Sequence, residues 1–188
     1  MPTTTTSSVQ SLPARERILQ TAHTLFYRDG IRATGIDRVI AESGVTKVTF
    51  YRHFPSKNDL ILAFLEFRHQ RWMAWFTDAL ARHGGTAVAL VPALAEWLGS
   101  NSFRGCAFIN SVGELGLSLP GVVELAQRHK RDMVAAIASV LAPSEQREAD
   151  AQAIALAVDG AIIRVQMQAQ PDAALQSLNR VMKAMLAP

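Results

Sequence analysis

The 188-residue sequence contains a single cysteine and no run of about twenty uninterrupted apolar residues. One cysteine cannot build an internal disulfide framework and suits a reducing compartment. Without a long apolar run, no segment is expected to span a membrane. The N-terminus also lacks the cationic and apolar segments of a signal peptide. These absences argue against disulfide-rich secreted proteins and helical membrane proteins, and we expect a cytoplasmic protein.

Aromatic residues and catalytic motifs are also scarce. Only 7% of the residues are aromatic, and alanine and leucine dominate the second half, which favours helices over sheets. No glycine-rich phosphate loop is present. His69, His83 and His129 lack metal-ligand spacing and are expected on the surface. We therefore expect no metal, no cofactor and no enzymatic activity; an enzyme using Cys106 as nucleophile is the remote alternative.

The net charge of +3 is unevenly distributed along the chain. Residues 1–83 hold eleven Lys or Arg against seven Asp or Glu, which gives +4, whereas residues 84–188 hold eight against nine, which gives −1. Neutralising DNA phosphates requires such a basic surplus. Because the surplus is modest, it favours sequence-specific DNA binding over non-specific coating.

Residues 34–57, which read TGIDRVIAESGVTKVTFYRHFPSK, contain two short helical patterns separated by a glycine. Thr34 is expected to cap the first helix, with Asp37 completing a capping box. Ser43-Gly44 is expected to end it. A short helix, a glycine turn and a second short helix are typical of the helix-turn-helix, whose second helix lies in the DNA major groove.

The second helix of this pair is expected to begin after a Thr46 cap, to run from Lys47 to about His53, and to end before Pro55. Phe50 and Phe54 lie four residues apart and are expected to face inward. The residues left on the other faces are cations, hydroxyls and one short apolar side chain, as contacts to phosphates and to a thymine methyl require: Lys47, Val48, Thr49, Tyr51, Arg52 and His53. The alternative is a solvated helix with an incidental polar face.

A longer match extends this motif. The pieces RERILQTAHTLFYRDGIRAT, IDRVIAESGVTKVTFYRHF and SKNDLI follow one another between about Arg15 and Leu62. In order and spacing, including Tyr-x-His-Phe and Ser-Lys-x-x-Leu, this quarter of the chain resembles the TetR family of bacterial transcriptional regulators. Two departures are Val48, where the family commonly has glycine or proline, and Gly35, where it usually has serine or threonine.

The resemblance implies specific contacts with a double-stranded DNA operator. It implies that Lys47, Val48 and Thr49 read bases. It also implies phosphate contacts, which we assign to Thr34, Tyr51, Arg52, His53 and Lys57. Lys57 lies in the first turn of the next expected helix, where a helix N-terminus favours an anion; an ordinary exposed lysine is the alternative.

Helical periodicity continues through the rest of the chain. Helices are expected over about 14–29, 56–82, 86–99, 120–141 and 144–168, with a last helix from Pro171, while Pro92 either kinks its helix or marks a late start. The basic run 127–131 is expected to be a solvated face. In the long fourth helix, Trp72 and Phe76 belong to an aromatic cluster that, with Trp97, either forms core or walls a ligand cavity.

The segment GCAFINSVGELG is also expected to be helical, and it resembles a segment seen in a subset of the family. Cys106, Asn110 and Glu114 then share one face of an otherwise apolar helix. Buried polar groups need partners, so this row is solvated, bonded within the core, or lines the pocket of an unknown small-molecule effector. Cys106 is either a small buried hydrophobe or, beside Arg104, an oxidant or electrophile sensor.

The helix expected over 144–168 is apolar nearly all round, so it must be buried on several sides. Small residues allow another helix to approach closely. With the amphipathic last helix it is expected to form a subunit interface, in agreement with the two-fold four-helix bundle of TetR-like proteins. The candidate interface residues are Ala153, Leu156, Ala157, Gly160, Ala161, Leu178, Met182 and Met185.

The expected fold is therefore all-α, with about nine helices: a disordered tail (1–12), a three-helix DNA-binding head (13–57) and a helical ligand-binding and dimerisation body (58–188). The expected function is that of a homodimeric repressor released from a palindromic operator by a small molecule. Its recognition helices would lie about 34–36 Å apart. A regulator that responds to oxidants or electrophiles through Cys106 is the alternative.

Overall fold

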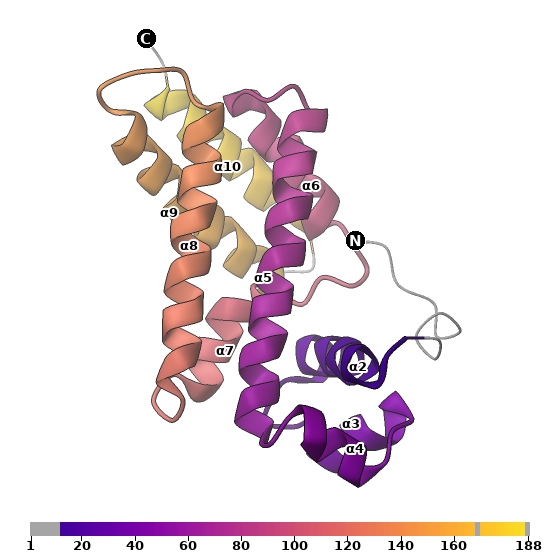
Figure 1. Cartoon of the computed structure of the whole chain (residues 1–188). Helices are drawn as coiled ribbons and strands as arrows, with labels where there is room; N and C mark the ends of the chain where they lie inside the picture. The colour runs from indigo at the N-terminus through magenta and orange to yellow at the C-terminus, as the bar shows by residue number, and fades with distance from the viewer. Residues whose placement is uncertain (1–11, 168–169, 187–188) are drawn as a thin grey trace. The chain divides into compact units, whose positions relative to one another are not determined.

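The computed structural model describes residues 12–167 and 170–186 (Figure 1). The expected tail over residues 1–12 therefore lies, except for its last residue, outside the described part. The described residues form nine α-helices and no strand, which confirms the all-α prediction. The helices are α2 (Ala14–Asp29), α3 (Ile36–Ser43), α4 (Lys47–His53), α5 (Lys57–Arg82), α6 (Leu90–Leu98), α7 (Ala107–Leu115), α8 (Pro120–Val140), α9 (Arg147–Met167) and α10 (Pro171–Met185), with a 3₁₀ turn at Ala87–Ala89.

The described residues form two compact units. The first, here called the head unit, contains residues 12–70 and 107–126, and the second, the body unit, contains 71–106, 127–167 and 170–186. Each of α5 and α8 contributes residues to both units. No described helix is long and apolar enough to cross a bilayer.

In the head unit, α2 packs against both α3 and α4. The buried stripe of α2 is the predicted one, and it consists of Ile18, Leu19, Ala22, Leu25 and Phe26. Phe26 meets Phe64 of α5 edge to face, with ring centroids 5.4 Å apart. Because α3 and α4 are too short to be stable alone, burial against α2 is what holds them in place.

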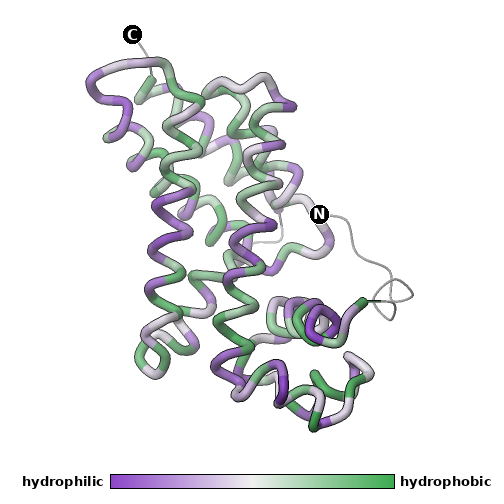
Figure 2. The backbone as a smooth tube through the Cα atoms, viewed as in Figure 1, coloured by the Kyte–Doolittle hydropathy of each residue, from purple (hydrophilic) through white to green (hydrophobic). Residues whose placement is uncertain are grey.

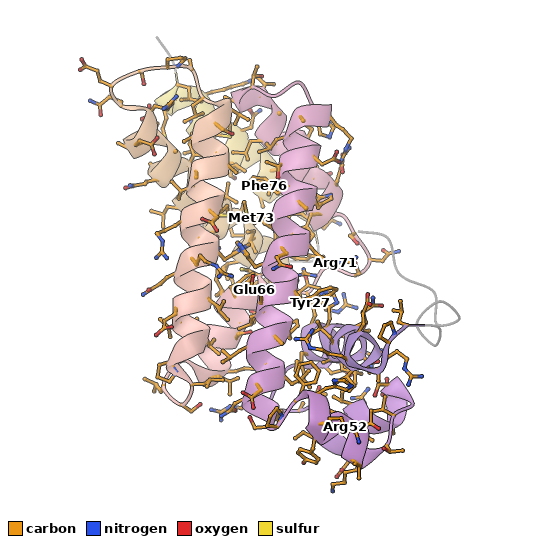
Figure 3. All side chains as sticks on the ribbon, in the orientation of Figure 1. Tyr27, Arg52, Glu66, Arg71, Met73 and Phe76 are labelled. Atoms are coloured by element: carbon orange, nitrogen blue, oxygen red, sulfur yellow. The ribbon has the colours of Figure 1, made fainter. Side chains whose placement is uncertain are left out.

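Tyr27 and Arg68 join α2 to α5 within the same unit. The Arg68 guanidinium lies 3.9 Å from the centroid of the Tyr27 ring, and Figure 3 shows Tyr27 beside α5. Arg68 is almost fully buried and also lies 3.3 Å from Nε2 of His23. A cation over an aromatic face in a desolvated setting stabilises by about 2 kcal/mol, so this contact reinforces the packing of α2.

In the body unit, α10 packs against α9 and α6. The buried apolar residues of these helices include Ile154, Val158 and Ile162 of α9 and Leu175 and Leu178 of α10. Figure 2 shows the corresponding mixture of hydrophobic and hydrophilic positions along the helices. Within the single chain α9 is not buried all round, since Leu156 and Met167 are 76% and 72% exposed.

Two helices begin later than expected. The helix predicted from Thr86 begins at Leu90 after the 3₁₀ turn, so Pro92 lies in its first turn and marks a late start. The helix predicted from Ser144 begins at Arg147, and the Ser144 carbonyl accepts the Arg147 N–H at 3.4 Å. In both cases a hydrogen-bonded turn pairs backbone groups before the helix starts.

The expectation that residues 127–131 form a solvated face is wrong for two of them. His129 is 2% exposed, and its ring lies edge to face with Trp72 at a centroid distance of 5.0 Å. Lys130 is half-buried and pairs with Asp159 of α9. A charged run gives no indication of which members turn inward on a helix that packs on two sides.

Candidate nucleic-acid interface

Helix α4 is built as the sequence predicts. The Thr46 side-chain oxygen accepts the Thr49 N–H at 3.2 Å and lies 2.9 Å from the Thr49 hydroxyl. Phe50 and Phe54 are buried, with ring centroids 6.3 Å apart. Before it, Gly44 ends α3 with a left-handed φ of 64°, a conformation that glycine adopts without strain. Cap, inward aromatics and glycine turn together orient the opposite face of α4 outward.

The outward face of α4 carries the residues predicted to read DNA. Val48 is 71% exposed and Tyr51 is 41% exposed. Lys47 and Arg52 are also exposed, and Figure 3 shows Arg52 on α4. Thr49 and His53 are half-buried. The Lys47 ammonium lies 3.8 Å from the Asp37 carboxylate, both in water, so this pair is weak and leaves the lysine accessible.

Thr34 does not cap α3 as predicted, and it is not exposed as a phosphate contact would require. The residue at the N-cap of α3 is Gly35, without a side-chain cap bond. Thr34 is fully buried, and its hydroxyl donates to the Gly30 carbonyl at 2.8 Å. The capping box with Asp37 is therefore wrong. A buried hydroxyl cannot reach a phosphate, so Thr34 supports the turn before α3 and is not a DNA contact in this structure.

Lys57 is more enclosed than its position suggests. Ser56 caps α5 as predicted, accepting the Asp59 N–H at 3.1 Å. The Lys57 ammonium donates to the Ile31 carbonyl at 2.7 Å. Burial lowers the pKa of Lys57, and the nearby Glu114 carboxylate opposes that shift. An ammonium has three N–H donors, and only one of them is needed for the bond to the Ile31 carbonyl. The contact between Lys57 and a DNA phosphate therefore stays a prediction.

Ion pairs join the end of α2 to α3. Asp29 accepts from Arg28 at 2.7 Å and from Arg38 at 2.9 Å, and Arg38 also pairs with Glu42 at 2.8 Å. The hydrogen bond from Arg28, followed by the Arg38 bond, lowers the pKa of Asp29 to about 2. Asp29 is thus ionised at any physiological pH and links the first two helices of the head unit.

Glu114 is hydrogen-bonded within the chain, as one of the sequence alternatives proposed. Its carboxylate accepts backbone N–H bonds from Ile31 at 3.3 Å and Arg32 at 2.8 Å in the turn between α2 and α3. Asn110 is half-buried on the same helix. Cys106 precedes α7, which begins at Ala107, so the expected three-residue row on one helix is incomplete. The backbone groups that bond to Glu114 lie 82 and 83 residues away in the sequence, so no local sequence pattern predicts these bonds.

The aromatic candidates for an effector pocket do come together in the body unit. Trp72 stacks on Phe76 at a centroid distance of 4.7 Å and meets Trp97 edge to face at 5.5 Å. All three are almost fully buried, and His129 completes the group. Among the described residues, the buried Trp72 Nε1 has no hydrogen-bond partner. An unpaired donor inside an aromatic group costs free energy.

Cys106 is a buried free thiol, 3% exposed. This location agrees with the alternative of a small buried hydrophobe. The sensor hypothesis stays a prediction, since it requires a reagent to reach the sulfur. In the part of the chain that the structure describes, no group of three His, Cys, Asp or Glu residues has the arrangement of a metal site.

The candidate interface residues divide into two sets. Ala153, Leu156 and Gly160 are exposed on α9 and Ala157 is half-buried, as is Met185 of α10. Ala161, Leu178 and Met182 are buried within the body unit itself, at 5%, 2% and 4% exposure, so they belong to the core of the chain. Sequence spacing missed Met167 and Val181, two further exposed apolar residues on these helices.

A buried three-helix core that presents a capped, exposed second helix defines a helix-turn-helix DNA-binding protein. Residues 18–64 match the family described as bacterial regulatory proteins, tetR family. The structure is similar to that of SCO4454, a TetR-family transcriptional regulator from Streptomyces coelicolor, with a TM-score of 0.83 and 29% identity over 98% of this chain and 96% of that one.

Sequence relatives agree with this comparison. The chain is 28% identical to the transcriptional regulator AcuR of Cereibacter sphaeroides, over 76% of this chain and 72% of that protein. It is 42% identical to the uncharacterised HTH-type regulator YerO of Bacillus subtilis over 53 residues, 28% of this chain. For other curated relatives the match covers only part of their length: 18% of YerO, and 54% of an uncharacterised HTH-type regulator of Lactococcus lactis. Residues 18–64 thus carry the DNA-binding segment of the tetR family, and over nearly its whole length the chain is similar in fold to a TetR-family transcriptional regulator.

Proposed function

We propose that this regulator binds a palindromic double-stranded DNA operator through α4. The exposed face of α4 carries this proposal, because Lys47, Val48 and Arg52 are in water while Phe50 and Phe54 fix the helix from behind. By the same proposal Lys47, Val48 and Thr49 read bases. Tyr51, Arg52, His53 and Lys57 contact phosphates, which position the helix without specifying sequence. A regulator of chromosomal DNA acts where the chromosome lies, so we propose a cytoplasmic location.

Val48 provides a sharp test of base reading, because its exposed methyl groups suit contact with a thymine methyl. Operator DNA upstream of the protein's own gene would be varied one base pair at a time and titrated with Val48→Ala. We expect the variant to lose about tenfold in discrimination at one position of each half-site. Val88→Ala is the matched control, because Val88 is an 81% exposed valine outside α4. Identical base preferences in both variants would remove Val48 from the base-reading set.

We also propose that the chain acts as a homodimer joined through α9 and α10. The support is an apolar exposed stripe on α9, with Ala153, Leu156, Gly160 and Met167 on one face. Exposed large apolar side chains on a helix next to small residues favour close approach of another helix. A two-fold dimer presents two recognition helices to a palindrome. In this proposal residues 13–57 bind DNA and residues 58–188 serve the dimer and the effector.

We propose further that a small molecule binds in the body and releases the operator, so that the protein is a repressor. The aromatic group around Trp72 supports this proposal, because its unpaired Nε1–H suits a planar ligand that carries a hydrogen-bond acceptor. Allosteric coupling of about 1–3 kcal/mol would lower operator affinity about 5–150-fold. The test is operator release by a panel of planar aromatic compounds in the same titration, and Trp72→Phe is expected to weaken the response.

A further inference from the structure

The turn between α2 and α3 is satisfied by groups from outside the helix-turn-helix. Gly30 ends α2 with a φ of +90°, and Ile31 follows it, 2% exposed. The Ile31 and Arg32 N–H groups then point to the two oxygens of the Glu114 carboxylate, at 3.3 and 2.8 Å. Ile31 is buried, and a buried backbone donor requires a partner; for its N–H, and for the exposed N–H of Arg32, that partner is a carboxylate from α7.

The contact between Arg32 and Glu114 is reciprocal. The Arg32 backbone donates to the Glu114 side chain, and Nε of Arg32 donates to the Glu114 carbonyl at 2.9 Å. Glu114 lies in the last turn of α7 (Ala107–Leu115), where carbonyls have no partner inside the helix. The Glu114 carboxylate thus accepts a backbone N–H of the turn, and the Arg32 side chain donates to a carbonyl at the end of α7. We call this pair of contacts the Arg32–Glu114 clamp.

Two further hydrogen bonds complete the environment of the turn. Lys57 donates to the Ile31 carbonyl at 2.7 Å, and the Thr34 hydroxyl donates to the Gly30 carbonyl at 2.8 Å. The turn is therefore held by α5, by α7 and by Thr34, which lies two residues before the start of α3. Of these anchors, only the Glu114 carboxylate satisfies two backbone N–H groups at once, and hydrogen bonds to a charged acceptor are stronger than neutral ones.

We propose that Glu114 is a positioning residue for operator binding: its carboxylate fixes the α2–α3 turn, and thereby α3 and α4, in the geometry that fits the major groove. The inference rests on the proposed operator binding. Helix α3 begins at Ile36, directly after this turn, and packs against α4. Glu114 touches no DNA in this account, so its effect on affinity is exerted through backbone position alone.

The experiment compares Glu114→Ala, Glu114→Gln and the control Glu124→Ala with the wild-type protein. Glu124 is an exposed carboxylate on α8 of the same unit. Anisotropy titrations of upstream and scrambled DNA would be run over a salt series, and thermal unfolding would establish that each variant is folded at the assay temperature. Amide exchange of Ile31 and Arg32 would be followed by NMR, since it reports on the clamp without DNA.

We expect Glu114→Ala to weaken specific binding about tenfold or more at every salt concentration. The salt slope should stay that of wild type because no phosphate contact is lost, and the Ile31 and Arg32 amides should exchange faster. Glu114→Gln keeps one acceptor oxygen and should lose less, and it carries the test alone if the alanine variant does not fold. Glu124→Ala should change nothing.

Wild-type affinity, or tighter binding, in a folded Glu114 variant would overturn the inference while leaving the proposed function intact. A reduced salt slope would also overturn it, because Glu114 would then act on phosphate contacts. If the wild-type protein itself shows no preference for upstream or any genomic DNA, the proposed function fails and the positioning role fails with it.

Discussion

The Thr46 side-chain oxygen accepts the Thr49 backbone N–H at 3.2 Å and so closes the first turn of α4. This helix has only seven residues, fewer than an isolated helix needs for stability in water. The cap therefore adds to the burial against α2 that holds the segment proposed to read DNA in place.

Thr46→Ala should lower the free energy of unfolding by about 1 kcal/mol and weaken operator binding, because α4 loses its cap. Chemical denaturation and anisotropy would measure the two effects. Thr86→Ala is the matched control: Thr86 occupies the N-cap of the 3₁₀ turn without a side-chain cap bond. Equal, negligible losses in both variants would contradict a stabilising role for the Thr46 cap.

Lys57→Ala should weaken binding to all DNA sequences and flatten the salt slope by about one unit, if the ammonium contacts a phosphate. The Ile31 carbonyl would lose its bond from Lys57, so some loss of stability should accompany the change. The measurement is the dependence of the binding constant on salt. An unchanged slope with lower stability would assign Lys57 to the α2–α3 turn alone.

The stability of the body unit should fall in acid partly through Glu96. Hydrogen bonds from Arg82 and then His83 lower the pKa of Glu96 to about 2, from 4.5. A group with a lowered pKa contributes stability above its unfolded pKa and loses that contribution as pH falls toward the folded one. The loss should therefore occur between about pH 4.5 and 2, and because the side chains are exposed it should stay within about 1 kcal/mol.

Thermal unfolding of Glu96→Gln against pH measures this contribution. The variant should show a shallower decline than wild type between pH 5 and 3, whereas Glu145→Gln, at an exposed position, should follow the wild-type curve. Parallel curves for wild type and Glu96→Gln would show that the ion pairs with Arg82 and His83 contribute nothing measurable.

Leu156→Glu should convert the proposed dimer to monomer, because it places a charge on the exposed apolar stripe of α9. Leu156 is 76% exposed in the chain, so the fold of the protomer should survive. Sedimentation analysis and circular dichroism would test both statements. Ala135→Glu adds the same charge at an exposed position of α8 and should leave the oligomeric state unchanged. A dimeric Leu156→Glu protein would remove this stripe from the interface.

Local features were predictable from the sequence because their signals are local. Gly30 and Gly44 end helices, and Thr46 and Ser56 cap them, through partners within four residues. These signals were sufficient for the bounds of α2 and α4 and for the inward positions of Phe50 and Phe54.

Long-range partners were not predictable in this way. Glu114 binds a turn more than eighty residues away, and His129 is buried against Trp72 despite its basic neighbours. Thr34 carries the signature of a cap, yet its hydroxyl donates to the Gly30 carbonyl. Tertiary packing decides such cases, since a polar side chain bonds to whichever group the fold brings within reach.

The most direct test of the account is the affinity of the wild-type protein for DNA from upstream of its own gene and for scrambled DNA, measured by fluorescence anisotropy across a salt series. We predict a saturable preference for the upstream DNA that survives physiological salt, with one dimer or a multiple of it bound per palindrome. Weak, equal and steeply salt-dependent binding to both would place the operator elsewhere in the genome and call for a genome-wide binding screen. Failure to bind any of these DNAs even at low salt would contradict the account.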